Sequence, residues 1–220
     1  MKENILEIDS IQKKVDTKWI LSDVYLKCKT NDVIGLLGRN GSGKSTLLKI
    51  IFGIIPSDNK CIKINGIVKN KTSDLLQEVS YLSQEQFIPN YFSVKKAISL
   101  SIEPEREKGF YDDEMIQSIK DKRIDQLSGG ELRYLEIKII LSKPSKFILL
   151  DEPYNGLSPL MVEKVNQLIK DNSSQKGIIV TDHDYENVIL ISNQLLLLKD
   201  GKIHHLKNKA ELIEKGYLKS

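Results

Sequence analysis

The feature of this sequence that most constrains its fold is a glycine-rich loop that fits the pattern G-x-x-x-x-G-K-[ST]. A short apolar run precedes it (33–37), and a segment with the apolar spacing of a helix follows it (46–52). The loop then lies at a helix N-terminus, where free N–H groups and the positive end of the helix dipole attract anions. It therefore predicts a triphosphate site in an α/β fold. Its residues are Gly38, Arg39, Asn40, Gly41, Ser42, Gly43, Lys44 and Ser45.

The residue types of this loop suit a polyphosphate. Glycines let the backbone approach the phosphates without a clash at Cβ. Lys44 is predicted to reach the β- and γ-phosphates and to take part in catalysis, and the hydroxyl of Ser45 to bind Mg²⁺. We expect the nucleotide contacts to run from Gly38 to Thr46. The alternative is a purely structural glycine turn, and the strand and helix that flank the loop argue against it.

Composition limits the kind of protein that carries the loop. The chain has 220 residues, 40% of them hydrophobic, and a net charge of +3, which is enough for one good-sized domain. So small a positive excess does not mark a dedicated nucleic-acid binder, and no nucleic-acid partner is expected. No apolar run approaches the roughly 18 residues of a membrane helix, and acidic residues interrupt the N-terminus where a signal peptide is apolar. With two isolated cysteines, these features predict a cytosolic protein.

Apolar patterning predicts alternating strands and helices along most of the chain. Nearly continuous apolar runs at 146–150 and 177–180 are typical of parallel strands that helices cover on both faces. Asn65-Gly66 and Asp200-Gly201 predict hairpin turns. We interpret 89–142 as a mostly helical insertion, with a flexible loop as the alternative for its charged centre. Further predicted elements are strands at 5–8, 20–26 and 79–82 and a terminal helix at 209–215.

Two acids follow one of the buried strands. Residues 147–150 are apolar, and Asp151 and Glu152 come next. Functional sites in parallel sheets lie at the carboxyl ends of the strands. Asp151 is therefore predicted to bind Mg²⁺ directly or through water, and Glu152 to orient and deprotonate a water molecule. Many strands end in acids, so the pair gains its meaning from the phosphate loop.

A second glycine motif, at 127–131, begins another helical pattern and is similar to the signature sequence of ATP-binding cassette (ABC) transporter subunits. Its residues also suit an ordinary helix start, because Ser128 is a good N-cap and Glu131 completes a capping box. Its position between the phosphate loop and the acidic strand end favours the resemblance. In that family the motif contacts the γ-phosphate of ATP held by a partner, so that two chains enclose two ATP molecules. The residues to which this implied role applies are Ser128, Gly129, Gly130 and Glu131.

The resemblance extends to two further positions. Gln84 is similar to the glutamine that contacts Mg²⁺ or water and senses the γ-phosphate. His183 resembles the switch histidine that follows the last core strand and touches the γ-phosphate. Without this context, both would be ordinary surface residues, which is how we interpret His204 and His205.

The resemblance covers residues 5–216 and implies a fold. That fold has a P-loop NTPase core with a mostly parallel sheet, an N-terminal antiparallel β subdomain and a small helical insertion. The chain, 1–220, would be a single ABC ATPase domain, with its core and β subdomain at 1–88 and 146–220. The helical subdomain, at about 89–145, would carry the signature motif. The insertion is short for the family, which implies a small docking surface.

Two positions depart from the family pattern. The family has an aromatic residue that stacks on adenine, and its place falls near Val15, which is not aromatic. Trp19 is a nearby substitute, although we favour a core or structural role for it. Ser158 replaces an aspartate that helps to link the two ATP sites of the dimer. The first departure bears on base selectivity and the second on coupling between the sites.

Together, the motifs and the resemblance predict an ATP-binding and ATP-hydrolysing subunit that powers an ABC transporter, with ATP and Mg²⁺ as cofactors. Its partners would be a second copy or a homologous cassette, and a separate transmembrane permease that docks near Gln84 and the insertion. The permease would hold the chain at the inner face of the cell membrane. The alternatives are a soluble ABC ATPase outside transport and a degenerate cassette that binds ATP without hydrolysis. The transported substrate and the direction of transport reside in the permease and not in this chain.

Overall fold

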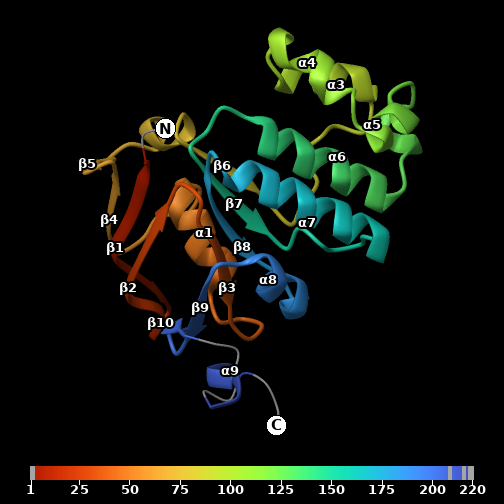
Figure 1. Ribbon diagram of the computed structural model, residues 1–220. Coiled ribbons are helices and arrows are strands. Elements are labelled where there is room, and N and C mark those ends of the chain that lie inside the picture. Colours follow the sequence, from red (N-terminus) through yellow and green to blue (C-terminus); the bar gives the residue numbers. More distant parts are fainter. Residues whose placement is uncertain (1–2, 208–209, 215–216, 218–220) are drawn as a thin grey trace.

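The computed structural model describes residues 3–207, 210–214 and 217, and it places two β-sheets on either side of one helix (Figure 1). Within these residues the larger sheet has the strand order β10-β9-β3-β8-β7-β6. Its strands are parallel except for β10, which pairs antiparallel with β9. This confirms the predicted mostly parallel sheet. The strands are β3 (Val33–Leu37), β6 (Val79–Leu82), β7 (Phe147–Asp151), β8 (Gly177–Thr181), β9 (Gln194–Lys199) and β10 (Lys202–Leu206).

Strand β7 shows why the central strands have unbroken apolar sequences. Ile148 and Leu150 pack in a core that includes residues of α6, α7 and α8. Phe147 and Leu149 pack in a second core, built around α1 between the two sheets. Helices thus cover both faces of the sheet, and neither face of the strand is left to polar residues. The helices are α1 (Lys44–Phe52), α6 (Gly129–Ser142), α7 (Pro159–Ser173) and α8 (Tyr185–Ile191).

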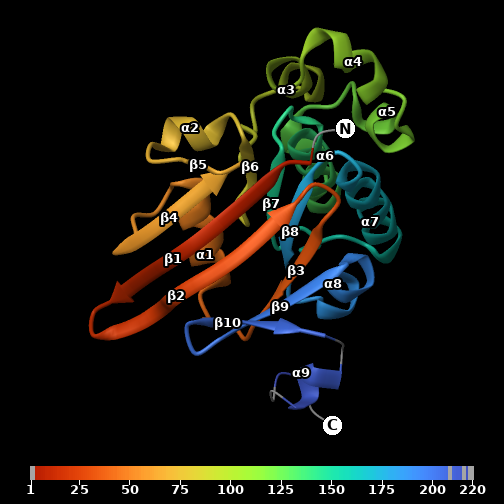
Figure 2. The same cartoon turned by 60° about the vertical axis from the view of Figure 1, so that its left-hand side comes forward.

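The smaller sheet is antiparallel, in the order β2-β1-β4-β5, and it lies against α1 (Figure 2). This confirms the predicted N-terminal antiparallel unit. Asn65 and Gly66 have φ angles of 53° and 79°, as the predicted type I′ turn requires. The first strand is longer than the predicted 5–8. The prediction was too short because shifts of register along the strand obscure the alternation of apolar and polar residues. The strands are β1 (Ile5–Val15), β2 (Lys18–Lys29), β4 (Asn59–Ile64) and β5 (Ile67–Val68).

The predicted insertion is helical, and its charged centre forms short helices rather than a loop. Asp113 caps one of them, because its Oδ1 accepts hydrogen bonds from the amides of Met115 and Ile116. Its Oδ2 accepts hydrogen bonds from Tyr134 and Lys138 on α6, which ties the insertion to that helix. In both views these helices lie together beyond α6 (Figures 1 and 2). They are α3 (Val94–Ser101), α4 (Pro104–Phe110), α5 (Glu114–Ile119) and a 3₁₀ turn (Ile124–Gln126).

Two short helices complete the described structure. They are α2 (Thr72–Leu76) and α9 (Ala210–Glu214). The second is the predicted terminal helix, of which Lys209 and Lys215 lie outside the described residues. In the part of the chain that the structure describes, no helix combines the length and the apolar character needed to cross a membrane.

Candidate active site

The glycine loop connects β3 to α1, and its backbone takes conformations that a Cβ atom would oppose. Gly41 and Gly43 have φ angles of 75° and 102°, in the left-handed region that side chains disfavour. A Cβ atom on Gly43 would lie 2.8 Å from Cγ2 of Ile20. The curl of the loop therefore depends on glycine at these positions. It places Lys44 at the first residue of α1.

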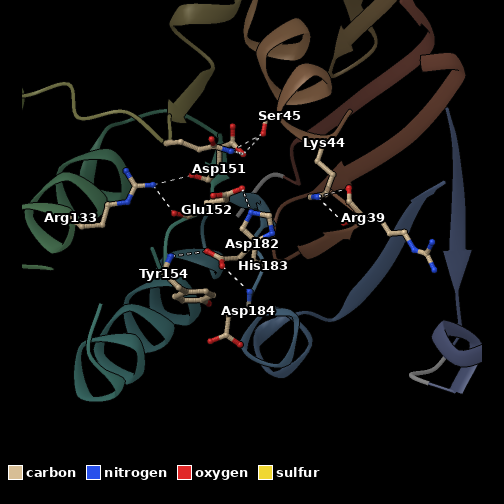
Figure 3. Close-up of polar contacts among 12 residues, drawn as sticks. Arg39, Lys44, Ser45, Arg133, Asp151, Glu152, Tyr154, Asp182, His183 and Asp184 are labelled. Carbon is tan, nitrogen blue, oxygen red and sulfur yellow. Dashed lines mark hydrogen bonds and ion pairs between the residues drawn. The ribbon is translucent and has the colours of Figure 1, made fainter. Parts of the chain in front are cut away.

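Lys44 is a buried cation at the centre of this loop (Figure 3). Its Nζ donates hydrogen bonds to the carbonyl oxygens of Gly38 at 2.7 Å and Arg39 at 3.3 Å. Burial lowers the pKa of the ammonium group, whereas the nearby charges of Glu152 and Asp151 raise it. Carbonyl oxygens of the loop thus hold the ammonium group at the start of α1, and a helix N-terminus favours a polyphosphate.

Three side chains predicted to bind the metal come together at the end of β7. The Ser45 hydroxyl donates to Asp151 Oδ1 at 2.9 Å. Gln84 Nε2 lies 3.0 Å from Ser45 Oγ and 3.4 Å from Asp151 Oδ1. A hydroxyl, a carboxylate and an amide beside a phosphate-binding loop suit Mg²⁺, which takes a few protein oxygens and completes its shell with phosphate and water. The residues present therefore fit a magnesium ion.

Glu152 and His183 form the other polar contact of the site. They follow the adjacent parallel strands β7 and β8, and His183 Nε2 lies 2.8 Å from Glu152 Oε1. Glu152 has a φ of 52°, and its amide donates to the Thr181 carbonyl oxygen at 2.7 Å. A left-handed conformation costs a non-glycine residue about 1–2 kcal/mol. Asp151 and Glu152 thus have different polar partners, Ser45 and His183 (Figure 3).

Most of these side chains line one pocket, and a larger hollow lies beside it. The pocket has a volume of about 410 Å³ and is lined by residues 40–46 of the loop with Ile20, Gln84, Glu152 and His183. The hollow beside it has a volume of about 630 Å³ and shares Ile20 and loop residues 40–42 with the pocket. Both volumes fall within the roughly 300–1,000 Å³ of small-molecule sites. The pair is large enough for a nucleotide whose phosphates lie on the loop.

The hairpin between β1 and β2 borders this hollow, and it corrects one expectation. Trp19 is 45% exposed and lines the hollow, so it is not a core residue. Lys14 Nζ lies 5.7 Å from the centre of the Trp19 ring. Val15 pairs with Lys18 and Lys14 pairs with Trp19, and the register then shifts so that Lys13 pairs with Leu21 and Ile20 is the extra residue of β2. Val15 is exposed and lies directly across from Lys18, which lines the hollow with Trp19 and Ile20.

The signature segment forms the start of α6 and has the predicted capping box. The Glu131 amide donates to Ser128 Oγ at 3.2 Å, and the Ser128 amide donates to Glu131 Oε2 at 2.7 Å. The hydrogen bond from the Ser128 amide lowers the pKa of Glu131, and Lys122 lowers it further. Among the described residues that line the phosphate pocket, none belongs to 128–131.

Ser158, which departs from the family pattern, caps a helix. Its hydroxyl accepts a hydrogen bond from the Met161 amide at 3.4 Å, at the start of α7. The loop before it is tied to the segment after β8, because the Tyr154 amide donates to Asp182 Oδ2 at 2.8 Å. Serine thus provides the cap at the start of α7 without a carboxylate.

Two further residues, which were not among the predicted site residues, hold this site. The Tyr81 hydroxyl donates to Asp151 Oδ2 at 2.9 Å, and burial raises the pKa of Tyr81. Arg133 donates to the carbonyl oxygens of Asp151 and Glu152. Tyr81 lies in a strand that the pattern did predict. The signal that could have found Arg133 is its spacing from an acid: Glu136 follows it by one turn in a mainly apolar stretch of α6.

A glycine loop around a buried lysine, at the carboxyl edge of a parallel sheet and beside two acids, defines the class of P-loop nucleotide-binding proteins. Comparison with known families narrows this class. The family model of the ABC transporter matches residues 21–155. The chain belongs to the ABC transporter family.

Relatives resemble nearly the whole chain. The lipopolysaccharide export system ATP-binding protein LptB of Haemophilus influenzae is 30% identical over 220 residues, which cover 91% of this chain and 89% of that protein. The ABC transporter ATP-binding protein YtrB of Bacillus subtilis is 27% identical, with 98% of this chain and 75% of that protein covered.

Solved structures share the fold. An ATP-binding subunit of an ABC transporter has a TM-score of 0.84 at 18% identity, with 98% of this chain and 95% of that chain covered. A dimeric bacterial ABC transporter cassette has a TM-score of 0.79 at 22% identity, with 92% and 99% covered. These structures confirm the predicted P-loop α/β fold.

Proposed function

We propose that this chain binds ATP with Mg²⁺, hydrolyses it, and drives a separate membrane-spanning partner as a dimer of cassettes. One observation carries the proposal: a single pocket is lined by the glycine loop, Gln84, Glu152 and His183, which come from separate parts of the chain. Phosphoryl transfer mainly requires positioning and charge neutralisation. The pocket brings together side chains that can supply both.

In the proposed complex, Lys44 and the loop amides bind the β- and γ-phosphates. Ser45, Asp151 and Gln84 hold the magnesium ion, which neutralises phosphate charge when bound. The hydrogen bonds among these three side chains support this assignment, because they bring the three polar groups close enough together to bind one ion.

Glu152 is the proposed general base. It takes a proton from a water molecule as the water oxygen attacks the γ-phosphorus in line, and the bond to ADP breaks. His183, 2.8 Å from the Glu152 carboxylate, orients that group and contacts the γ-phosphate. The backbone hydrogen bond from the Glu152 amide to the Thr181 carbonyl oxygen holds the base at the edge of the sheet.

A second cassette completes the proposed site. The start of α6, at residues 128–131, lines no part of this chain's own phosphate pocket among the described residues. It is the N-terminus of a 14-residue helix, which favours an anion. We assign this helix start to the γ-phosphate of the partner's ATP. In this proposal, residues from about 89 to 145 form the helical subdomain, and residues 1–88 and 146–220 form the core.

The proposed transport partner follows from the relatives, whose names describe transporter ATP-binding proteins. A permease would dock near Gln84 and the helical insertion and hold the chain at the inner face of the cell membrane. We propose no nucleic-acid partner.

Phosphate release by the purified chain tests the proposed activity. With Mg²⁺ and ATP we expect turnover whose rate per chain rises with chain concentration until the dimer is saturated, because each site needs its partner. Chelation of Mg²⁺ should abolish it. ATP binding without phosphate release would instead support a degenerate cassette that only binds.

Purification from solubilised membranes tests the proposed partner. We expect the chain to co-purify, in constant proportion, with a protein of several apolar helices. A stable complex with soluble proteins alone would instead support an ABC ATPase outside transport.

Val15→Tyr tests how the base is bound. The new ring would lie across from Lys18, which lines the hollow, and a base stack contributes about 1–3 kcal/mol, so ATP affinity should rise roughly 5- to 150-fold. Calorimetry with ATP measures it, and Lys27→Tyr, an exposed position of β2 outside the residues that line the hollow, is the control. If Val15→Tyr changes nothing while Trp19→Ala weakens binding, Trp19 already stacks on the base.

A further inference from the structure

Helix α6 carries a buried charge pair that no role proposed above requires. Arg133 is 6% exposed and Glu136 is fully buried, one turn apart on the same helix. Burial lowers the pKa of Arg133 and raises that of Glu136, so removing both groups from water carries a cost. Such a pair needs compensating contacts.

The compensating contacts are made mainly with the backbone of the active site. Arg133 and Glu136 approach each other only at 3.5 Å. Arg133 Nη2 donates to the carbonyl oxygens of Asp151 at 3.0 Å and Glu152 at 2.8 Å (Figure 3). Its Nη1 donates to the carbonyl oxygen of Ser83 at 2.8 Å. An arginine retained for its ion pair alone would be expected to face the carboxylate bidentately.

Glu136 binds the other end of the segment that holds Gln84. Its Oε1 accepts a hydrogen bond from the Phe87 amide at 2.8 Å. Ser83 and Phe87 therefore mark the two ends of a five-residue stretch, the Gln84 segment (83–87), and each end is held by one member of the pair. The same arginine holds the backbone at Glu152, so three parts of the site converge on one turn of α6.

We propose that Arg133 and Glu136 are positioning residues that set the Gln84 segment and the backbone of Glu152 relative to each other. The inference rests on the proposed ATPase function and deepens it. A displacement of the Gln84 segment would then move the general base, because the guanidinium fork is shared by both. The pair lies on the helix whose first turn is assigned to the partner's nucleotide, so closure of the dimer would act on the same unit.

Arg133→Lys and Arg133→Met test this role. A lysine keeps the charge, but its single Nζ cannot reproduce the planar fork. We expect kcat for ATP hydrolysis to fall roughly 10- to 100-fold, as for a small displacement of a catalytic group, while the affinity for a non-hydrolysable ATP analogue stays within about threefold. An unchanged kcat, or a loss confined to affinity, would overturn the proposal.

Lys138→Met is the matched control. Lys138 also lies on α6 and forms a largely buried ion pair, with Asp113 at 2.6 Å. It belongs to none of the contacts with the Gln84 segment or Glu152 described above. We expect a lower unfolding midpoint for this variant with little change in kcat. A loss of kcat as large as that of Arg133→Met would mean that any broken pair on α6 has the same effect, and the proposal would fail.

Two further measurements separate positioning from general destabilisation. Gln84→Ala should reduce kcat much less in the Arg133→Met background than alone, since the segment is already released; multiplicative effects would contradict the proposal. Glu136→Gln retains an acceptor for the Phe87 amide and should lose less activity than Glu136→Ala. Equal losses would exclude a role for that contact. If Arg133→Met does not fold, Arg133→Lys and the Glu136 variants carry the test.

The two proposals fail in different ways. A wild-type chain that binds ATP but releases no phosphate contradicts the proposed function. A wild-type chain that hydrolyses ATP, with Arg133 variants that match Lys138→Met, contradicts the positioning role alone.

Discussion

Glu152→Gln is expected to abolish most ATP turnover while leaving ATP binding intact. Glutamine keeps the size of the side chain but cannot accept the proton of the attacking water, and general base catalysis contributes about 10²- to 10⁴-fold. The Glu152 carboxylate pairs with His183 and, among the described residues, has no hydrogen bond to the glycine loop, so the phosphate contacts should survive. Phosphate release measures the loss.

The same variant should accumulate as a dimer with ATP, because hydrolysis is the step that opens the proposed interface. Sedimentation with Mg²⁺ and ATP measures this. Glu163→Gln, on the exposed side of α7, is the matched control and should behave as wild type. Wild-type turnover in Glu152→Gln would remove Glu152 from the mechanism.

Lys44→Ala is expected to weaken ATP binding and to stop turnover. The ammonium is buried inside the loop, where water competes little with a phosphate for it. A charge-assisted hydrogen bond of this kind contributes about 1.5–3 kcal/mol, which corresponds to roughly 10- to 150-fold in affinity. Calorimetry with Mg²⁺ and ATP measures the change.

Lys49→Ala provides the control for that experiment, because Lys49 lies on the same helix and outside the residues that line the phosphate pocket. Its ATP affinity should match that of the wild type. Unchanged affinity and rate in Lys44→Ala would show that the loop does not bind the phosphates, and the proposed function would fail with it.

Local patterns were sufficient for the loop and for the strands around it. Gly41 and Gly43 adopt the left-handed angles for which only glycine is well suited, and Asn65-Gly66 forms the turn its residue types predict. The apolar run before Asp151 is a central parallel strand, as its pattern indicated. The pattern was misleading at β1, where register shifts break the alternation, and at Trp19, which is exposed at a strand end.

Spacing alone could not place the side chains that meet across the sheet. Ser45 and Asp151 are 106 positions apart and share a hydrogen bond, and Arg133 reaches the Ser83 carbonyl oxygen from 50 positions away. The contact between His183 and Glu152 likewise depends on β7 and β8 being neighbours.

The sequence by itself determined the phosphate loop, the parallel strand that ends in two acids, and the helix start at Ser128, since each follows from short-range backbone preference and apolar period. The tertiary structure alone decided which side chains share the pocket, what holds Glu152 in a left-handed conformation, and why Arg133 and Glu136 are buried. These depend on strand order and helix packing, which bring together residues that no local pattern connects.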